Sequence, residues 1–502
     1  MPLLDQPLGV REDEAFFFDH PIGRQAALAL AHAHGAAGGG DVSIAGAATS
    51  TSDLTLKGAR DGSVTGAFNS GGIGAVQAGR NATFANALNT VGDLSVAANA
   101  GQVSLATVST QGNLTATAGT SLSATGLVVS AGSANATAGT DMTLTGGVAA
   151  QHTGTMVAGG NLSAAAVAFG DQASLSAGGN VNITNGVATN GALTATAGNS
   201  LTLGSAQAGA AMTLAANGQA GGGDISVAGT TVAGGLLSMT AARDVSLTGA
   251  VLGYNAANLT AGRNLAIGGA FGTNANTTLT ATTGNLSVAG PLTTGGNLKA
   301  TSGGGLALSG GLVNGDTTLT AQGGVTLTGN LLGLGAATVN AGGAIAGGGA
   351  LSFAKDTSLQ AGSGITLGGI ETAGKLTATA GSDIALGATT AVGDVKVQST
   401  SGSATFGGQV ATGGNLNVLA AQNVSATSGV SAVGNVSMTG TQGNVTVGGV
   451  SANGDATLQA GQTLALSGTS TVAGQVGLSG NNVTLTGTLA GSKDVNVTAQ
   501  GT

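Results

Sequence analysis

Short runs of alternating apolar and polar residues follow one another along almost the whole sequence, separated by glycine-rich turns. In the stretch "GGNLKATSGGGLALSGGLVNGD", from Gly295 to Asp316, apolar residues occupy every second position of each run. Alternation with a period of two indicates β-strands with one buried face. A helix of about ten or more residues does not fit between the glycines, so we predict an all-β protein.

The runs repeat with a period of 19 to 21 residues, the kind of self-similarity that is typical of solenoids. In the second half of the sequence a turn residue followed by a first, longer strand recurs at Thr277, Asn297, Thr317, Ala337, Asp356, Lys375, Asp394, Asn415, Asn435, Asp455, Gln475 and Asp494.

A second strand lies between these starts and repeats with the same period. We expect its apolar pairs to form a structural core ladder, which includes Leu286, Val288, Leu306, Leu308, Val325, Leu327, Ile365, Leu367, Ile384 and Leu386. A weaker third apolar mark follows at Leu292, Leu312, Leu351, Ile370, Val410, Val430 and Val450. Each repeat therefore offers three short strands separated by corners.

One such repeat cannot bury its apolar face, whereas stacked repeats can, because each strand pairs with the equivalent strand one coil away. We therefore predict a right-handed parallel β-helix, a three-sided solenoid with about 20 residues per coil. The pattern from Asp41 to the end allows about 23 coils, which at about 4.8 Å per coil would extend on the order of 110 Å.

The first 40 residues differ from the rest of the sequence. Residues 1–40 contain the run Phe16, Phe17, Phe18 and no repeat, and we expect an irregular N-terminal segment or a cap that protects the first strands from edge pairing. Residues 41–502 form the predicted β-helix region. The start of the sequence has no basic region followed by an apolar core, so it does not form a signal-peptide pattern.

Composition narrows the chemistry that is open to this protein. Of its 502 residues, 42% are apolar, 2% aromatic and 6% charged, and none is cysteine. Disulfides, thiolate metal sites and cysteine nucleophiles are therefore excluded. The net charge of −8 and the lack of a basic patch argue against nucleic acid as a partner, and no apolar run is long enough to insert into a membrane.

The openings "GGNL", "GGNV" and "AGRNL", followed by Leu-Thr-Ala or Val-Thr-Leu strands, resemble the repeats of the filamentous haemagglutinin family over residues 41–502. These are large bacterial exoproteins of two-partner secretion systems. The resemblance implies an extended adhesin at the extracellular cell surface, exported by an outer-membrane transporter and contacting a receptor or glycan on a host or neighbouring cell. Residues 1–40 contain no match to the family's secretion domain.

Several Asn-x-Ser/Thr triplets could accept glycans, as some related adhesins do. The repeat also produces them by placing a turn asparagine before a strand whose outward residue is Ser or Thr. We favour this structural interpretation for Asn113, Asn161, Asn258, Asn285, Asn435 and Asn482.

No residue is expected to act in catalysis or to bind a cofactor or metal. "GGGDVSIAG" at Gly38 and "GGGDISVAG" at Gly221 resemble calcium-binding nonapeptides, but these need a nine-residue period with an Asp in every turn. The histidines are His20, His32, His34 and His152, and a catalytic or metal role for His32 and His34 would need acidic or nucleophilic partners held nearby, of which none is visible. We expect solvated side chains and a protein that is not an enzyme.

Ice binding would require a flat ladder of outward Thr-x-Thr pairs. In the second half of the sequence only three of twelve outward pairs are of this kind, Thr278/Thr280, Thr318/Thr320 and Thr377/Thr379, and no two of them are adjacent. The array is broken, which argues against this function.

The leading hypothesis is an adhesive or structural stalk of a surface adhesin. The alternatives are the stalk of a toxin delivery protein in contact-dependent inhibition and, less favoured, a polysaccharide-processing β-helix enzyme, which would need clustered Asp, Arg or Lys in a groove.

Overall fold

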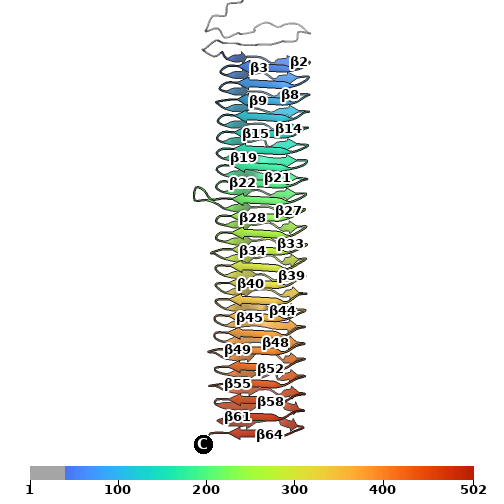
Figure 1. The fold of residues 1–502 in the computed structure, drawn as a ribbon, viewed down its shortest axis with the longest axis vertical. Coiled ribbons are helices and arrows are strands. Elements are labelled where there is room, and N and C mark those ends of the chain that lie inside the picture. Colours follow the sequence, from blue (N-terminus) through green and yellow to red (C-terminus); the bar gives the residue numbers. More distant parts are fainter. Residues whose placement is uncertain (1–39, 502) are drawn as a thin grey trace, which may run out of the picture. The chain divides into compact units, whose positions relative to one another are not determined.

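The computed structural model describes residues 40–501 (Figure 1). These residues form two units. Unit 1 contains residues up to 235 together with 240–242, and unit 2 contains 236–239 and 243–501. Between them the units hold about 23 turns of about 20 residues, built from strands with no helix among the described residues. The all-β parallel solenoid is thereby confirmed. The predicted N-terminal segment lies outside the described residues, except for residue 40.

A regular coil contains one five-residue strand and two three-residue strands. In unit 1 these are β9 (Leu94–Ala98), β10 (Val103–Leu105) and β11 (Val108–Thr110). Each strand pairs in parallel with its equivalents in the adjacent coils, so that Leu94 aligns with Leu114 of β12 (Leu114–Ala118). The stack therefore has three ladders, which we call the first (five-residue strands), second and third ladders in sequence order within a coil.

Unit 2 has the same three kinds of ladder. One coil there contains β37 (Leu298–Ser302), β38 (Leu306–Leu308) and β39 (Gly311–Val313). The remaining part of the coil serves as the connection between parallel strands, so no crossover helix is required. Unit 1 begins with β1 (Val42–Ile44), and unit 2 ends with β64 (Val495–Ala499).

The interior of each unit is filled by the alternate residues of all three ladders. The ten side chains that the sequence placed in the second ladder are 0–3% exposed: Leu286, Val288, Leu306, Leu308, Val325, Leu327, Ile365, Leu367, Ile384 and Leu386. The first ladder contributes small inward residues such as Ala281 and Ala300, which are also buried. A fully buried Leu, Ile or Val contributes about 1.5–3 kcal/mol, so this apolar interior is the main source of stability.

Hydroxyl groups occupy many of the last inward positions of the third ladder. The Oγ of Ser70 donates to the carbonyl oxygens of Ser52 and Ile73, both at 2.9 Å, and Thr110 Oγ1 donates to that of Gly92 at 2.7 Å. These bonds provide the buried hydroxyl groups with partners among the corner carbonyls.

One predicted core position is wrong. Leu312, taken from the sequence as an inward residue of the third strand, is 41% exposed, while Val313 is buried. The corner before β39 contains residues 309–310, whereas the corner before β36 (Leu292–Thr294) contains 289–291. Because side chains alternate with a period of two, one residue fewer moves Leu312 to the outer face. Gly310, with φ of 108°, permits the tighter corner.

The corner between the second and third ladders is not uniform. In most coils it is a short turn, but five strands run through it without a break: β19 (Leu162–Phe169) and β21 (Val181–Thr189) in unit 1, and β44 (Ile345–Phe353), β46 (Ile365–Thr372) and β48 (Ile384–Ala391) in unit 2. The register between β19 and β21 shifts between Ala164 and Ala166. In these coils the second and third ladders are joined by extended backbone, with no separate turn between them.

Candidate functional site

The outer face of the third ladder in unit 1 contains a shallow hollow of about 350 Å³. Its floor is formed by the outward residues of three successive strands, Ala149 of β17 (Val148–Ala150), Ala168 of β19 and Ala188 of β21. Val129 and Gln207 occupy the same outward position in the coils on either side and are larger, so they close the hollow along the ladder. The hollow thus exists because three adjacent repeats carry alanine where their neighbours carry larger side chains.

The floor is held from beneath by Phe169, whose side chain is 4% exposed. A Cβ atom built on Gly154 of β18 (Gly154–Ala158) would lie 2.0 Å from the Phe169 ring, so the ring occupies the space that this glycine leaves open. The tight contact fixes Phe169 and, through the backbone, the adjacent Ala168. Dense packing of this kind makes the floor of the hollow rigid.

The rim of the hollow is polar and neutral. Gln151 and Asn190 stand at the corner that follows the third ladder, and Gln207 lies at one end; none of the lining residues is charged. Amide side chains offer both donors and acceptors. The arrangement suits recognition of a neutral partner by hydrogen bonds around a small apolar floor.

A histidine and an aspartate stand directly beside this rim. His152 Nδ1 lies 3.0 Å from Asp171 Oδ2, and the two side chains are 62% and 56% exposed. The sequence placed His152 in solvent without a partner; the structure confirms the exposure and supplies the partner. The partner was missed because it lies 19 residues away, one coil along.

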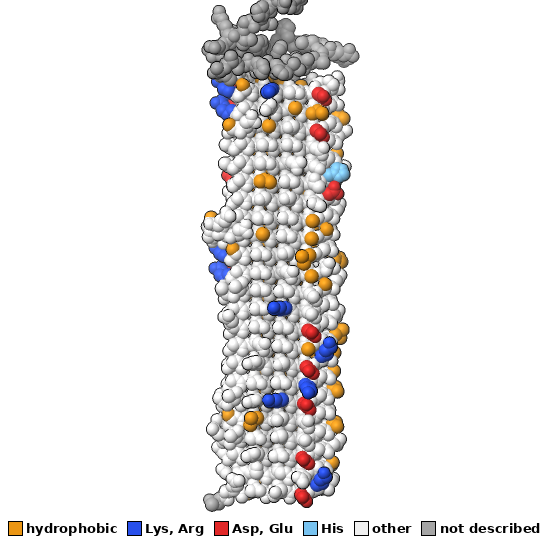
Figure 2. Space-filling view, in the orientation of Figure 1, with side chains coloured by type: hydrophobic (Ala, Val, Ile, Leu, Met, Phe, Trp, Pro, Cys, Tyr) orange, Lys and Arg blue, Asp and Glu red, His pale blue; other side chains and the backbone are white. Residues whose placement is uncertain are grey.

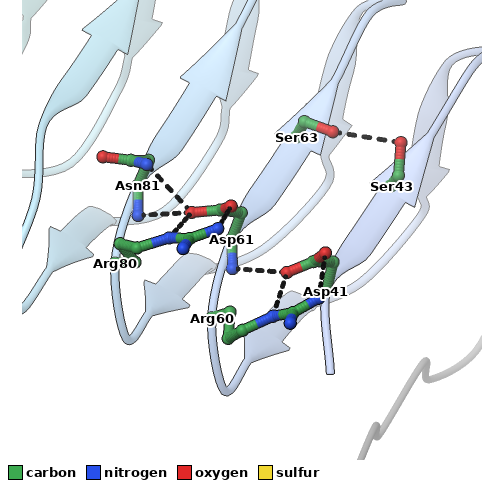
Figure 3. Close-up of polar contacts among 7 residues, drawn as sticks. All are labelled: Asp41, Ser43, Arg60, Asp61, Ser63, Arg80 and Asn81. Atoms are coloured by element: carbon green, nitrogen blue, oxygen red, sulfur yellow. Dashed lines mark hydrogen bonds and ion pairs between the residues drawn. The ribbon is translucent and has the colours of Figure 1, made fainter. Parts of the chain in front are cut away.

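The most pronounced electrostatic feature lies in unit 1, at the corner between the first and second ladders (Figure 3). Arg60 donates through Nε and Nη2 to Asp41 at 3.1 and 2.8 Å, and Arg80 donates through the same two nitrogens to Asp61. Each arginine therefore forms a two-pronged contact with the carboxylate of the preceding coil, the arrangement that gives Arg–carboxylate pairs their directionality.

These contacts favour the ionised carboxylates. The guanidinium of Arg80 lowers the pKa of Asp61 to about 2, assisted by the backbone N–H and the side-chain amide of Asn81. Arg60 likewise lowers the pKa of Asp41, as does the backbone N–H of Asp61. In unit 2, Arg263 lowers the pKa of Asp244 well below its usual range. Because the groups pair with one another, the corner binds successive coils together and leaves no strongly basic surface.

Asparagine and aspartate side chains form a second kind of contact between coils. Asn113 receives a hydrogen bond at Oδ1 from the backbone N–H of Ser133 at 2.9 Å, and its own amide donates to Asp93 at 3.2 Å. Asn161 and Asn180 make the same two kinds of bond, which gives a structural reason for asparagine before a strand. Figure 2 shows acidic and basic side chains interleaved along one edge of unit 2, on a face that is otherwise mostly uncharged.

The structural interpretation of the Asn-x-Ser/Thr triplets is correct for Asn113, Asn161, Asn285 and Asn435, whose Oδ1 atoms accept backbone N–H groups of the next coil. It is wrong for Asn258. This residue lies within β31 (Ala257–Ala261) and points outward, because the strand begins one residue earlier than the triplet suggests.

Within residues 40–501, no group of three or more His, Cys, Asp or Glu side chains has the arrangement of a metal site. Over the same range, no helix has the length and apolar character needed to cross a lipid bilayer. The ten core positions lie inside the stack and provide no surface group. The hollow of unit 1 is therefore the candidate functional site.

No family model, curated protein or solved structure matches this sequence. Fold and site therefore define its class, a parallel β-solenoid with a shallow, uncharged hollow on the third ladder of unit 1.

Proposed function

We propose that this solenoid is the extended, non-enzymatic part of a bacterial surface adhesin of the two-partner secretion type, and that the hollow of unit 1 contacts its receptor. The proposal rests on the resemblance of the repeats to filamentous haemagglutinin and on the separation of roles within each coil. The inward residues form a mainly apolar core, so the outward residues can vary without loss of the fold.

The single observation that carries the proposal is the run of three outward alanines that forms the floor of the hollow, with the buried Phe169 ring beneath it. Elsewhere in unit 1 the same ladder position carries Asn69, Asn89 and Val129. A rigid concave patch with amide groups at its rim lets a neutral group approach the sheet closely. A surface receptor or glycan on a host or neighbouring cell has suitable chemistry, and an outer-membrane transporter would export the protein.

Cell binding by the purified protein tests this function. Ala168→Arg fills the hollow with a long charged side chain, and we expect at least about a tenfold loss of binding to receptor-bearing cells. The matched control is Ala411→Arg, at the same outward position of β51 (Val410–Thr412) in unit 2, which should bind as the parent does. Equal binding by both variants would refute the proposal that the hollow contacts the receptor.

The toxin-delivery alternative predicts a different outcome. If the solenoid only holds another domain away from the cell, neither surface substitution changes cell binding, whereas shortening the stack of coils does. The enzyme alternative would be supported by hydrolase or lyase activity on glycans that Asp171→Asn abolishes. We propose that no such activity exists, because the hollow's lining has no charged side chain to transfer a proton.

A further inference from the structure

The corner between the first and second ladders is enlarged in one coil of unit 1. The preceding corners of this kind contain residues 178–180 and 198–200, whereas residues 217–224 connect β25 (Met212–Ala216) to β26 (Ile225–Val227). This segment, which we call the 217–224 loop, leaves the stack as the green projection in Figure 1. Gly218, Gly221 and Gly223 in it have φ angles of 72°, 81° and 100°.

The 217–224 loop begins with the dipeptide Asn217-Gly218. The sequence has five Asn-Gly dipeptides, with asparagines at positions 185, 190, 217, 314 and 453. In this dipeptide the backbone nitrogen of glycine can attack Cγ of the asparagine amide, because glycine has no Cβ to obstruct the approach. The rate of this attack depends on whether the glycine N–H is held in a hydrogen bond or in a strand.

Three of the dipeptides lie in tight corners whose glycine N–H is bonded to the adjacent coil. Gly191 N donates to Asp171 O at 2.5 Å, Gly315 N to Gly296 O at 3.1 Å and Gly454 N to Gly434 O at 3.1 Å. Gly186 lies inside β21, in register with Ala166. At these sites the nitrogen must first leave its hydrogen bond or its strand, which makes the attacking geometry rare.

Asn217-Gly218 lacks this restraint. Asn217 is exposed, and within residues 40–501 neither its side-chain amide nor the N–H of Gly218 has a hydrogen-bond partner. The flanking nitrogens are held, since Asn217 N donates to Ala197 O at 3.0 Å and Gln219 N to Gly198 O at 2.8 Å. The loop is thus anchored at both sides of a free Gly218 nitrogen.

We infer that Asn217 is a site of spontaneous deamidation. The nitrogen of Gly218, after losing its proton to water or hydroxide, bonds to Cγ of Asn217 and expels the side-chain nitrogen as ammonia, which leaves a cyclic imide. Water then adds to one of the two imide carbonyls. Cleavage of the Cγ–N bond gives aspartate, and cleavage of the original peptide bond gives a β-linked isoaspartate. In total, one water is consumed and one ammonia released.

The modification changes the 217–224 loop and leaves the strand pairing between coils intact. It converts a neutral side chain into a carboxylate, and the isoaspartyl form adds one carbon to the backbone. Residues 217–224 belong to no strand, so neither change breaks a ladder. The site is independent of the hollow and of the proposed adhesive function.

Peptide mapping by mass spectrometry after incubation of the folded protein at mildly alkaline pH tests the inference. We expect Asn217 to convert about tenfold or more faster than Asn190, Asn314 and Asn453, with the rate rising with pH, and the isoaspartyl product to accept a methyl group from an isoaspartyl methyltransferase. In denaturant the four rates should converge. Equal rates in the folded protein, or conversion of a corner asparagine first, would overturn it.

A variant without the 217–224 loop tests whether rapid deamidation arises at Asn217. Replacement of residues 217–224 by the three-residue corner "GNS" of residues 198–200 removes the dipeptide and should leave the protein folded and without rapid deamidation. Persistent rapid ammonia release from that variant would contradict the assignment to Asn217.

Discussion

The outer face of the third ladder differs between the two units, although the coil is the same. In unit 1 its outward positions include Ala149, Ala168 and Ala188, which form a hollow. In unit 2 the same positions include Leu252, Leu312 and Leu332, which are 41–45% exposed. Except in residues 482–499, where the strand residues are mostly exposed, the inward residues of both units are mainly apolar or hydroxylated and buried. The fold therefore depends on the inward residues, while the outward residues can differ between coils without altering it.

The largest difference between inward and outward residues is expected when the same charge is placed at an inward and at an outward position of one coil. Leu327→Asp introduces a carboxylate at a position that is 0% exposed, and we expect a loss of about 3–5 kcal/mol or local unfolding of neighbouring coils. Leu332→Asp, at a position that is 45% exposed, should change the free energy of unfolding by about 0.5 kcal/mol or less.

Chemical denaturation followed by circular dichroism measures both variants, and Lys299→Asp provides a second outward control. Because repeat proteins can unfold in parts, the unfolding of individual coils should also be followed by hydrogen exchange. Equal tolerance of Leu327→Asp and Leu332→Asp would refute the separation into inward and outward roles.

A second test addresses the floor of the hollow. Gly154→Ala adds a methyl group that would lie 2.0 Å from the Phe169 ring, and we expect a loss of about 1–3 kcal/mol in the free energy of unfolding. The matched substitution Gly62→Ala in β4 (Gly62–Val64) meets its nearest atom, Ala78 Cβ, at 3.7 Å. It should be neutral or stabilise by up to about 1 kcal/mol, since it restricts only the unfolded state.

The smallest expected effect concerns the charged corner of unit 1. The pKa of Asp61 is about 2 in the folded protein and about 3.9 in the unfolded state. Its contribution to stability is therefore complete above about pH 4 and is lost as the pH falls toward 2. Asp61→Asn should make the denaturation midpoint less dependent on pH between about pH 2 and 4. Near neutral pH, the midpoint of the variant should vary with pH as it does in the parent protein. An unchanged acid dependence would show that the pair with Arg80 does not form in solution.

Much of the fold was predictable because it depends on local rules repeated many times. Alternation with a period of two identified strands, and the 20-residue repeat identified their neighbours, so all ten second-ladder residues were placed where they are found buried. Leu312 was misplaced because a corner shorter by one residue reverses which side chains face inward, and corner length is not visible in an apolar pattern.

The hollow could not be predicted from strand patterns alone. It forms because three alanines in adjacent coils stand in a column between Val129 and Gln207, and this is visible only when equivalent positions are compared across coils. The charged pairs did leave a signal. Asp41 and Arg60, Asp61 and Arg80, and His152 and Asp171 are each 19 residues apart, so a search for opposite charges one coil apart would have found them.

The register between coils is the central claim, and cysteine pairing tests it directly because the protein has no cysteine of its own. Thr278 and Lys299 are aligned outward neighbours in adjacent coils, and Thr318 is aligned one coil further on. At about 4.8 Å between paired strands, cysteines at positions 278 and 299 are within the Cα separation of a disulfide, whereas those at 278 and 318 are about twice as far apart. We predict that mild oxidation links the first pair and leaves the second pair reduced; efficient linkage of 278 to 318, or of neither pair, would contradict the stacked solenoid.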